Sequence, residues 1–129
     1  MPEFNDRITA VTGTDMLALA ERVREAAIPY LRQKAETEYL SDYRKVVLAS
    51  LMEDERVRLT REGERVTETR LDTAARLSPT YLRFLQDVRT QKERLAELEA
   101  GYYALRNALD VATEQLRFAR SEMYLQPNG

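Results

Sequence analysis

The sequence predicts an all-α protein, an elongated helical hairpin or coiled coil that ends in a long C-terminal helix. Four glycines, four prolines, 33% charged and 8% aromatic residues in 129 are typical of a helix-rich chain. So few turn residues do not suit a sandwich or barrel, which needs many turns. Apolar residues also recur every three or four positions over most of the chain, as they do on one face of a helix.

The N-terminal part divides into an arm and a first helical stripe. We expect residues 1–13 to form a flexible arm and residues 14–129 a single domain for oligomerisation and ligand binding, since the length suits one domain. Thr14 can cap a helix, and Asp15 favours its positive end. Pro29 interrupts the stripe and predicts a kink near Ile28 or a new helix that starts with this proline. The stripe comprises Met16, Leu19, Val23, Ala26 and Tyr30.

A second helical stretch is expected over residues 30–56. Its apolar positions again step by three or four, so we expect them to form the inner face of the helix, with charged residues outside. They are Leu31, Ala35, Tyr39, Tyr43, Val46, Val47 and Leu51, with Met52 as a further candidate.

The connector after this stretch allows two interpretations. Around Gly63, apolar and polar residues alternate, which would fit a small β-hairpin within residues 56–70. The alternative is a loop followed by a short helix over 67–77, capped by Thr67, with inward-facing Leu71, Ala74, Ala75 and Leu77. We favour the loop and helix, because an isolated hairpin is marginally stable.

The last third carries the clearest helical pattern. Ser78 and Pro79 form a strong start, a capping hydroxyl followed by proline at the first helical position. From Leu98 to Met123 the apolar spacing alternates between four and three, which is the repeat of a coiled coil. The seam consists of Leu98, Tyr102, Leu105, Leu109, Ala112, Leu116, Ala119 and Met123.

This seam predicts self-association. A helix over 79–123 would be roughly 68 Å long, and the helix over 30–56 would cover only about 40 Å of it. We therefore expect a homo-oligomer whose interface is the Leu98–Met123 seam. The alternative is a monomeric antiparallel hairpin in which the kinked N-terminal segment covers the remainder.

Composition excludes several kinds of chemistry. The chain has no Cys and no His, which excludes disulfides, Cys- or His-ligated zinc and Ser-His-Asp triads. It has no phosphate-binding glycine loop, no apolar run long enough for a membrane span and no signal-peptide pattern. We expect a non-enzymatic protein of the cytoplasm with no cofactor, metal site or membrane partner.

The arginines of the connector are the main functional lead. Six arginines stand against four carboxylates between residues 56 and 76, a local excess of two positive charges. Arginine binds phosphate through a bidentate fork, and several weak sites in an oligomer would gain by avidity. The alternative is a solvated segment with ion pairs inside the chain. Most of the seven tyrosines are expected in the core, with Tyr103 the best candidate for an exposed ring.

The order of these features resembles the UvsY-type recombination mediators of bacteriophages. The resemblance spans about residues 30–123 and rests on Tyr43-Arg44-Lys45-Val46-Val47-Leu48-Ala49, the glycine-containing break, the segment from Thr69 to Ser78, and Tyr102-Tyr103-Ala104-Leu105. It implies a helical oligomer that binds single-stranded DNA, displaces single-strand binding protein and helps load a RecA-like recombinase in the host cytoplasm. Arg44 and Lys45 match the basic pair of the family, whereas Ala49 and Leu51 stand where the family has further basic residues.

The sequence thus predicts a non-catalytic, oligomeric recombination mediator that binds single-stranded DNA. The expected phosphate contacts are Arg44, Lys45, Arg56, Arg58, Arg61, Arg65 and Arg70. The alternative function is a coiled-coil scaffold, adaptor or assembly chaperone without nucleic-acid binding.

Overall fold

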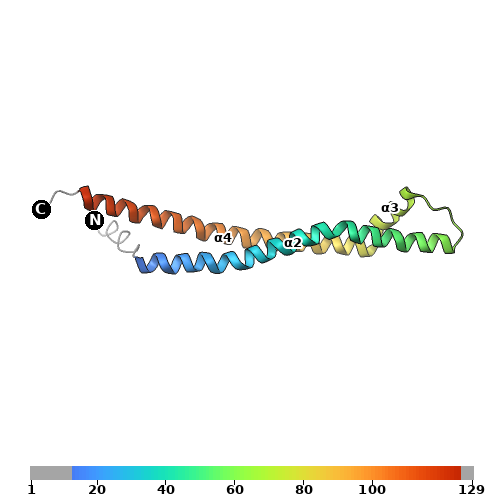
Figure 1. Cartoon of the computed structure of the whole chain (residues 1–129), viewed down its shortest axis with the longest axis horizontal. Helices are drawn as coiled ribbons and strands as arrows, with labels where there is room; N and C mark the ends of the chain where they lie inside the picture. The colour runs from blue at the N-terminus through green and yellow to red at the C-terminus, as the bar shows by residue number, and fades with distance from the viewer. Residues whose placement is uncertain (1–12, 126–129) are drawn as a thin grey trace. The chain divides into compact units, whose positions relative to one another are not determined.

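The structure, a computed structural model, describes residues 13–125 and is all-α over that range (Figure 1). Its helices are α2 (Gly13–Arg61), α3 (Glu68–Leu77) and α4 (Pro79–Leu125). The predicted all-α class is confirmed. The predicted arm lies almost wholly outside the described residues, apart from Gly13, which begins α2. No described helix combines the length and apolar content that crossing a membrane requires.

The small β-hairpin considered for residues 56–70 is wrong, since none of these residues forms a strand. Helix α2 continues to Arg61 and ends in a Schellman motif: the Glu64 N–H donates to the Leu59 carbonyl (2.9 Å) and the Gly63 N–H to the Thr60 carbonyl (3.2 Å). This motif needs a left-handed residue, and Gly63 supplies it with φ +71°. The glycine therefore terminates a helix instead of turning a hairpin.

The loop and short helix are confirmed. The connector, residues 62–67, is irregular. Helix α3 then starts after Thr67, whose hydroxyl accepts a hydrogen bond from the Arg70 N–H (3.2 Å). The side chains of Leu71 and Ala75 are buried as expected, but that of Leu77 is 70% exposed, which corrects the prediction for this residue.

Helix α4 begins where the sequence predicts. Ser78 lies outside the helix with extended backbone, and its hydroxyl accepts from the Thr80 N–H (3.3 Å). Pro79 is the first helical residue, where a missing N–H costs no intrahelical hydrogen bond.

Pro29 does not start a new helix, because α2 runs through it without a break. A proline inside a helix removes one backbone hydrogen bond at a cost of about 3 kcal/mol. Two residues that follow Pro29, Tyr30 and Gln33, are buried.

The contacts of the chain fall into two compact units. Unit 1 comprises the described residues up to Leu31 and from Ala96 onward, and unit 2 comprises Arg32–Leu95. Helices α2 and α4 contribute to both units. This division leaves the prediction of one domain over 14–129 untested, because each long helix is shared.

Unit 1 pairs the first part of α2 with the second part of α4. The beginning of α2 and the end of α4 lie at the same end of this unit, so the segments run antiparallel (Figure 1). The Tyr30 ring stacks on Tyr102 with centroids 5.2 Å apart. The predicted N-terminal stripe is buried or half-buried at Met16, Leu19, Val23, Ala26 and Tyr30. The Leu98–Met123 seam is half-buried at every position except Met123, which is 77% exposed.

This burial corrects the comparison of helix lengths on which the predicted oligomer was based. Helix α2 starts at Gly13, so it supplies a partner for the second part of α4 that the expected helix over 30–56 could not supply. The seam is therefore not left wholly uncovered within a single chain. Self-association through it stays a prediction.

Unit 2 has a core of different composition from the one expected. Its fully buried leucines are Leu59 near the end of α2 and Leu71 in α3. Between α2 and α4 lies a buried polar layer: Gln33 Nε2 donates to Gln91 Oε1 (2.5 Å) and to Thr37 Oγ1 (3.1 Å). Gln33 and Thr37 are 6% and 4% exposed, respectively.

The inner face predicted for residues 30–56 is largely wrong. Five of its eight apolar positions are exposed, namely Leu31, Ala35, Tyr39, Tyr43 and Val46, whereas Val47, Leu51 and Met52 are half-buried. Thr37 and Tyr39 are two residues apart and so point about 200° apart around the helix axis. The polar pair Gln33 and Thr37 occupies the buried face, and the apolar stripe lies on the opposite one.

Candidate nucleic-acid interface

Five of the seven predicted phosphate-binding residues, Arg56, Arg58, Arg61, Arg65 and Arg70, gather at the end of α2, in the connector and at the start of α3, all in unit 2. The Schellman turn at Gly63 and the Thr67 cap fix the backbone of this segment at both ends. Every arginine in it is exposed. The sequence predicted that these arginines contact phosphate, whereas in the structure several of them form ion pairs with carboxylates of the same chain.

Arg58 is the most strongly paired. It donates from Nε and Nη2 to the two oxygens of Glu55 (3.1 and 2.5 Å) and from Nη1 to Glu62 (2.9 Å). The hydrogen bond from Arg58 lowers the pKa of Glu55, and the same bond raises the pKa of Arg58. Both groups are therefore held in their charged forms.

Two further arginines are also held by carboxylates. Arg56 lies 3.5 Å from Glu53 and 3.3 Å from Glu68, joining the end of α2 to the start of α3. Arg70 pairs with Glu64 and donates to the Arg65 carbonyl (3.4 Å), so it ties the connector to α3.

Arg61 and Arg65 form no ion pair within residues 13–125, and both are exposed. They flank the connector, one at the last residue of α2 and the other two residues after Gly63. They are the cations of this segment that a phosphate can reach without displacing a carboxylate.

The formal charge around the connector is close to zero when the acidic residues that pair with its arginines are counted. Glu53, Asp54 and Glu55 lie on the last turns of α2, and two of them bind the arginines just described. Over residues 53–76, seven carboxylates face six arginines, for a formal charge of −1. The count over residues 56–76, which gave an excess of two positive charges, did not include these three acidic residues.

Arg44 and Lys45, the basic pair of the predicted motif, lie apart from this segment along α2. Arg44 donates from Nε to the hydroxyl of buried Tyr81 (2.7 Å), and its guanidinium carbon lies 5.9 Å from the ring centroid. It therefore joins α2 to α4. Lys45 is exposed and has no ion pair among the described residues.

The tyrosines also differ from expectation. Tyr103 is 43% exposed, as predicted, but Tyr39 is 67% and Tyr43 42% exposed, so neither belongs to the core. Their rings stack on each other with centroids 6.0 Å apart. Sequence reasoning placed them inside because their spacing matches a helical stripe, and spacing alone does not identify the buried stripe.

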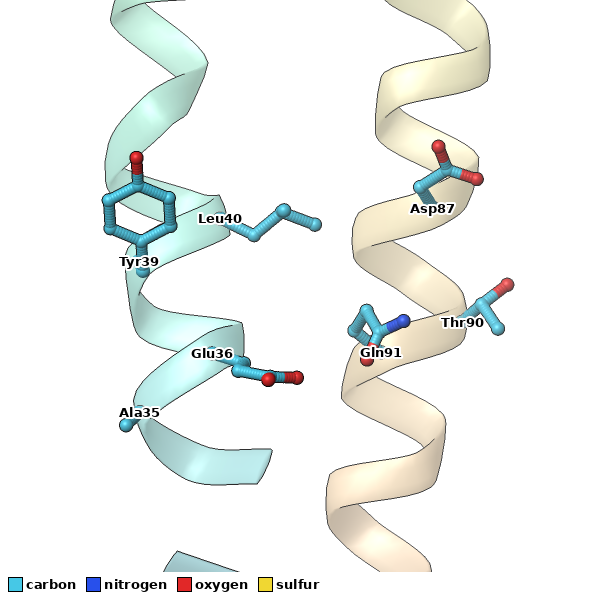
Figure 2. Close-up of a pocket in the computed structure, with 7 residues that line it drawn as sticks. All are labelled: Ala35, Glu36, Tyr39, Leu40, Asp87, Thr90 and Gln91. Carbon is cyan, nitrogen blue, oxygen red and sulfur yellow. The ribbon is translucent and has the colours of Figure 1, made fainter. Parts of the chain in front are cut away.

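A groove of about 600 Å³ lies between α2 and α4 in unit 2 (Figure 2). Leu40 and Glu36 both extend from α2 towards α4, and Asp87 lies on α4 across the groove. Other lining residues are Ala35, Tyr39, Thr90 and Gln91. This set offers no paired nucleophile and base, and no described group of three or more Asp or Glu side chains could hold a metal ion.

Comparison with known proteins adds no relative. No protein-family model, curated protein sequence or solved structure matches this chain.

Proposed function

We propose that this protein is a non-catalytic single-stranded DNA-binding protein that acts as a recombination mediator. The observation that carries the proposal is the group of exposed guanidinium groups around the connector, with Arg61 and Arg65 free of carboxylate partners among the described residues. The resemblance to UvsY-type mediators supports the recombination role, with single-strand binding protein displaced and a RecA-like recombinase loaded in the cytoplasm of the host.

Binding would proceed through phosphate neutralisation. Arg61 and Arg65 would contact phosphates directly. Arg56, Arg58 and Arg70 would exchange a carboxylate for a phosphate, because these arginine side chains are about half exposed and exposed pairs hold only about 0–1 kcal/mol. Lys45 would add a contact on α2, while Arg44 mainly positions the helix.

Because the local charge is close to neutral, a single copy of the protein would bind single-stranded DNA only weakly. An oligomer would repeat the segment and raise the affinity by avidity. The proposal therefore includes an elongated helical hairpin whose copies associate in coiled-coil fashion, with the Leu98–Met123 seam as one contact.

The second candidate is a helical scaffold, adaptor or assembly chaperone without nucleic-acid binding. The pairing of Arg56, Arg58 and Arg70 with carboxylates favours it, because such pairs also stabilise a loop that binds nothing. The exposed tyrosines of α2 favour it as well, since exposed aromatic surface is typical of protein contacts.

Fluorescence anisotropy with a labelled oligothymidine separates the two candidates. The DNA-binding protein shows saturable binding that weakens steeply with salt, and the triple change Arg58→Glu, Arg61→Glu and Arg65→Glu abolishes it. A triple change at exposed arginines outside the connector, Arg24→Glu, Arg89→Glu and Arg117→Glu, alters the net charge equally and serves as the control.

If the control variant loses binding as completely, the connector is not the interface. If the wild type binds no strand even at low salt, the scaffold replaces the first candidate. Oligomer size, measured by light scattering, should be the same for the wild type and the connector variant.

A further inference from the structure

The buried polar layer of unit 2 joins α2 to α4 through side-chain amides. The Gln33 amide donates to the side-chain oxygen of Gln91 (2.5 Å) and to the hydroxyl of Thr37 (3.1 Å). That hydroxyl donates in turn to the Gln33 carbonyl (2.7 Å), which holds it in place for the amide. Gln33 and Thr37 are almost fully buried, so water does not compete for these groups.

A second polar contact between the same helices has the same alignment. Arg44 donates from Nε to the hydroxyl of buried Tyr81 (2.7 Å). Along α2, Arg44 lies eleven residues after Gln33, and along α4, Tyr81 lies ten residues before Gln91. Antiparallel helices advance by equal lengths in opposite directions, so both contacts belong to one alignment of α2 against α4.

Apolar packing between these helices does not by itself select that alignment. On α4, Tyr81, Val88 and Leu95 are seven residues apart and buried or half-buried. On α2, half-buried Leu40 and Val47 are also seven apart. A slide of one helix by seven residues, about 10 Å, therefore sets apolar positions against apolar positions again.

The two amides do distinguish the alignments. A slide by seven residues in one direction sets Gln91 against Leu40, and a slide in the other direction sets Gln33 against Phe84. Neither hydrocarbon side chain has a hydrogen-bonding group. Each slide thus leaves both amides without their partner across the helices, and a buried polar group without a partner is unfavourable.

We propose that the Gln33–Gln91 pair is a register lock, a buried contact that selects one alignment of α2 against α4. Single buried polar contacts fix the register of coiled coils in this way, often with no gain in stability. Because the connector and α3 join the end of α2 to the start of α4, the alignment also decides how far apart those two helix ends lie. The lock does not depend on DNA binding.

The distance between two spin labels, measured by double electron–electron resonance, tests the register. The chain has no cysteine, so Ala49→Cys on α2 and Thr90→Cys on α4 place labels at two exposed positions of unit 2. These positions are staggered along the helix axes, and a slide by seven residues therefore changes their separation by about 10 Å. The doubly labelled parent chain should give a single distance.

Gln33→Leu with Gln91→Leu removes the lock without leaving an unpaired amide. This variant should show a second distance that differs from the first by about 10 Å. Gln86→Leu with Gln115→Leu is the control, since the same changes at exposed positions should leave one distance. If the leucine variant at the lock keeps the single distance of the parent chain, the proposal is overturned, and the short link through α3 sets the register instead.

Moving the polar pair gives a directional test. Gln33→Leu with Leu40→Gln keeps Gln91 and moves its partner by seven residues along α2, to a side chain that already extends towards α4 (Figure 2). The helices should slide until the relocated amide meets Gln91, which shortens the label separation by about 10 Å. This slide brings the end of α2 closer to the start of α4, so the chain between them is long enough. A separation equal to that of the parent chain contradicts the lock, whether or not the leucine variant folds.

Discussion

Arg58 and Glu55 form a two-point ion pair one turn apart on α2, with Nε and Nη2 of the arginine on the two carboxylate oxygens. The third nitrogen of the same guanidinium, Nη1, lies 2.9 Å from a carboxylate oxygen of Glu62. The arginine at the centre of the candidate interface is thus already bound by two carboxylates. This pairing decides how the segment can be tested.

Removing carboxylates should strengthen DNA binding if the arginines contact phosphates. Glu62→Gln with Glu64→Gln frees Arg58 and Arg70 from one partner each and raises the local charge by two. The affinity for a single strand should rise by up to about fivefold for each released pair, since an exposed pair holds about 0–1 kcal/mol. Anisotropy titrations at fixed salt measure this. Glu93→Gln with Glu114→Gln is the matched control, and an equal gain in that variant would point to net charge alone.

Two leucines of α3 provide a matched test of the fold. Leu71 is fully buried, whereas Leu77 is 70% exposed. Leu71→Ala should lower the free energy of unfolding by about 2–5 kcal/mol, because it leaves a cavity in unit 2. Leu77→Ala should change it by less than about 0.5 kcal/mol. Urea denaturation followed by circular dichroism gives both values, and equal losses would mean that α3 packs through a different face.

The buried polar layer predicts a contrast between single and double variants. Gln33→Ala leaves the Gln91 amide without its partner and should cost about 1–3 kcal/mol of unfolding free energy. Replacing both glutamines by leucine should be nearly neutral, because no unsatisfied group remains. Thermal and urea unfolding measure both. A double variant as unstable as the single one would show that the layer itself stabilises the fold.

Tyr30 predicts a dependence on alkaline pH. Burial raises its pKa above the ordinary value of 10.0, and the negative charge of Glu99 and the neighbouring Tyr103 raise it further. A raised pKa favours the neutral form in the folded state, so this contribution is complete below about pH 10 and is lost as pH rises through the folded pKa. Tyr30→Phe should therefore lose less unfolding free energy between about pH 9 and 11 than the wild type does. Parallel losses would mean that Tyr30 ionises equally in both states.

The sequence by itself determined the elements whose signals are local. Ser78 and Pro79 mark the start of α4, and Thr67 marks the start of α3, because capping depends on a side chain and the backbone beside it. The phase of the Leu98–Ala119 seam was also predictable, since its period is regular and α4 has no competing stripe of equal length.

Only the tertiary structure decided which face of α2 is buried. This helix carries an apolar stripe at Ala35, Tyr39 and Tyr43 and a more polar one at Gln33 and Thr37, and hydrophobic periodicity favours the first. Burial of the second depends on Gln91, 58 residues away, which satisfies the Gln33 amide. Likewise, the pairing of Arg56 with Glu68 requires α3 to return beside α2. A hydrogen-bond partner distant in the sequence changes the free energy of burial, and no local pattern contains that information.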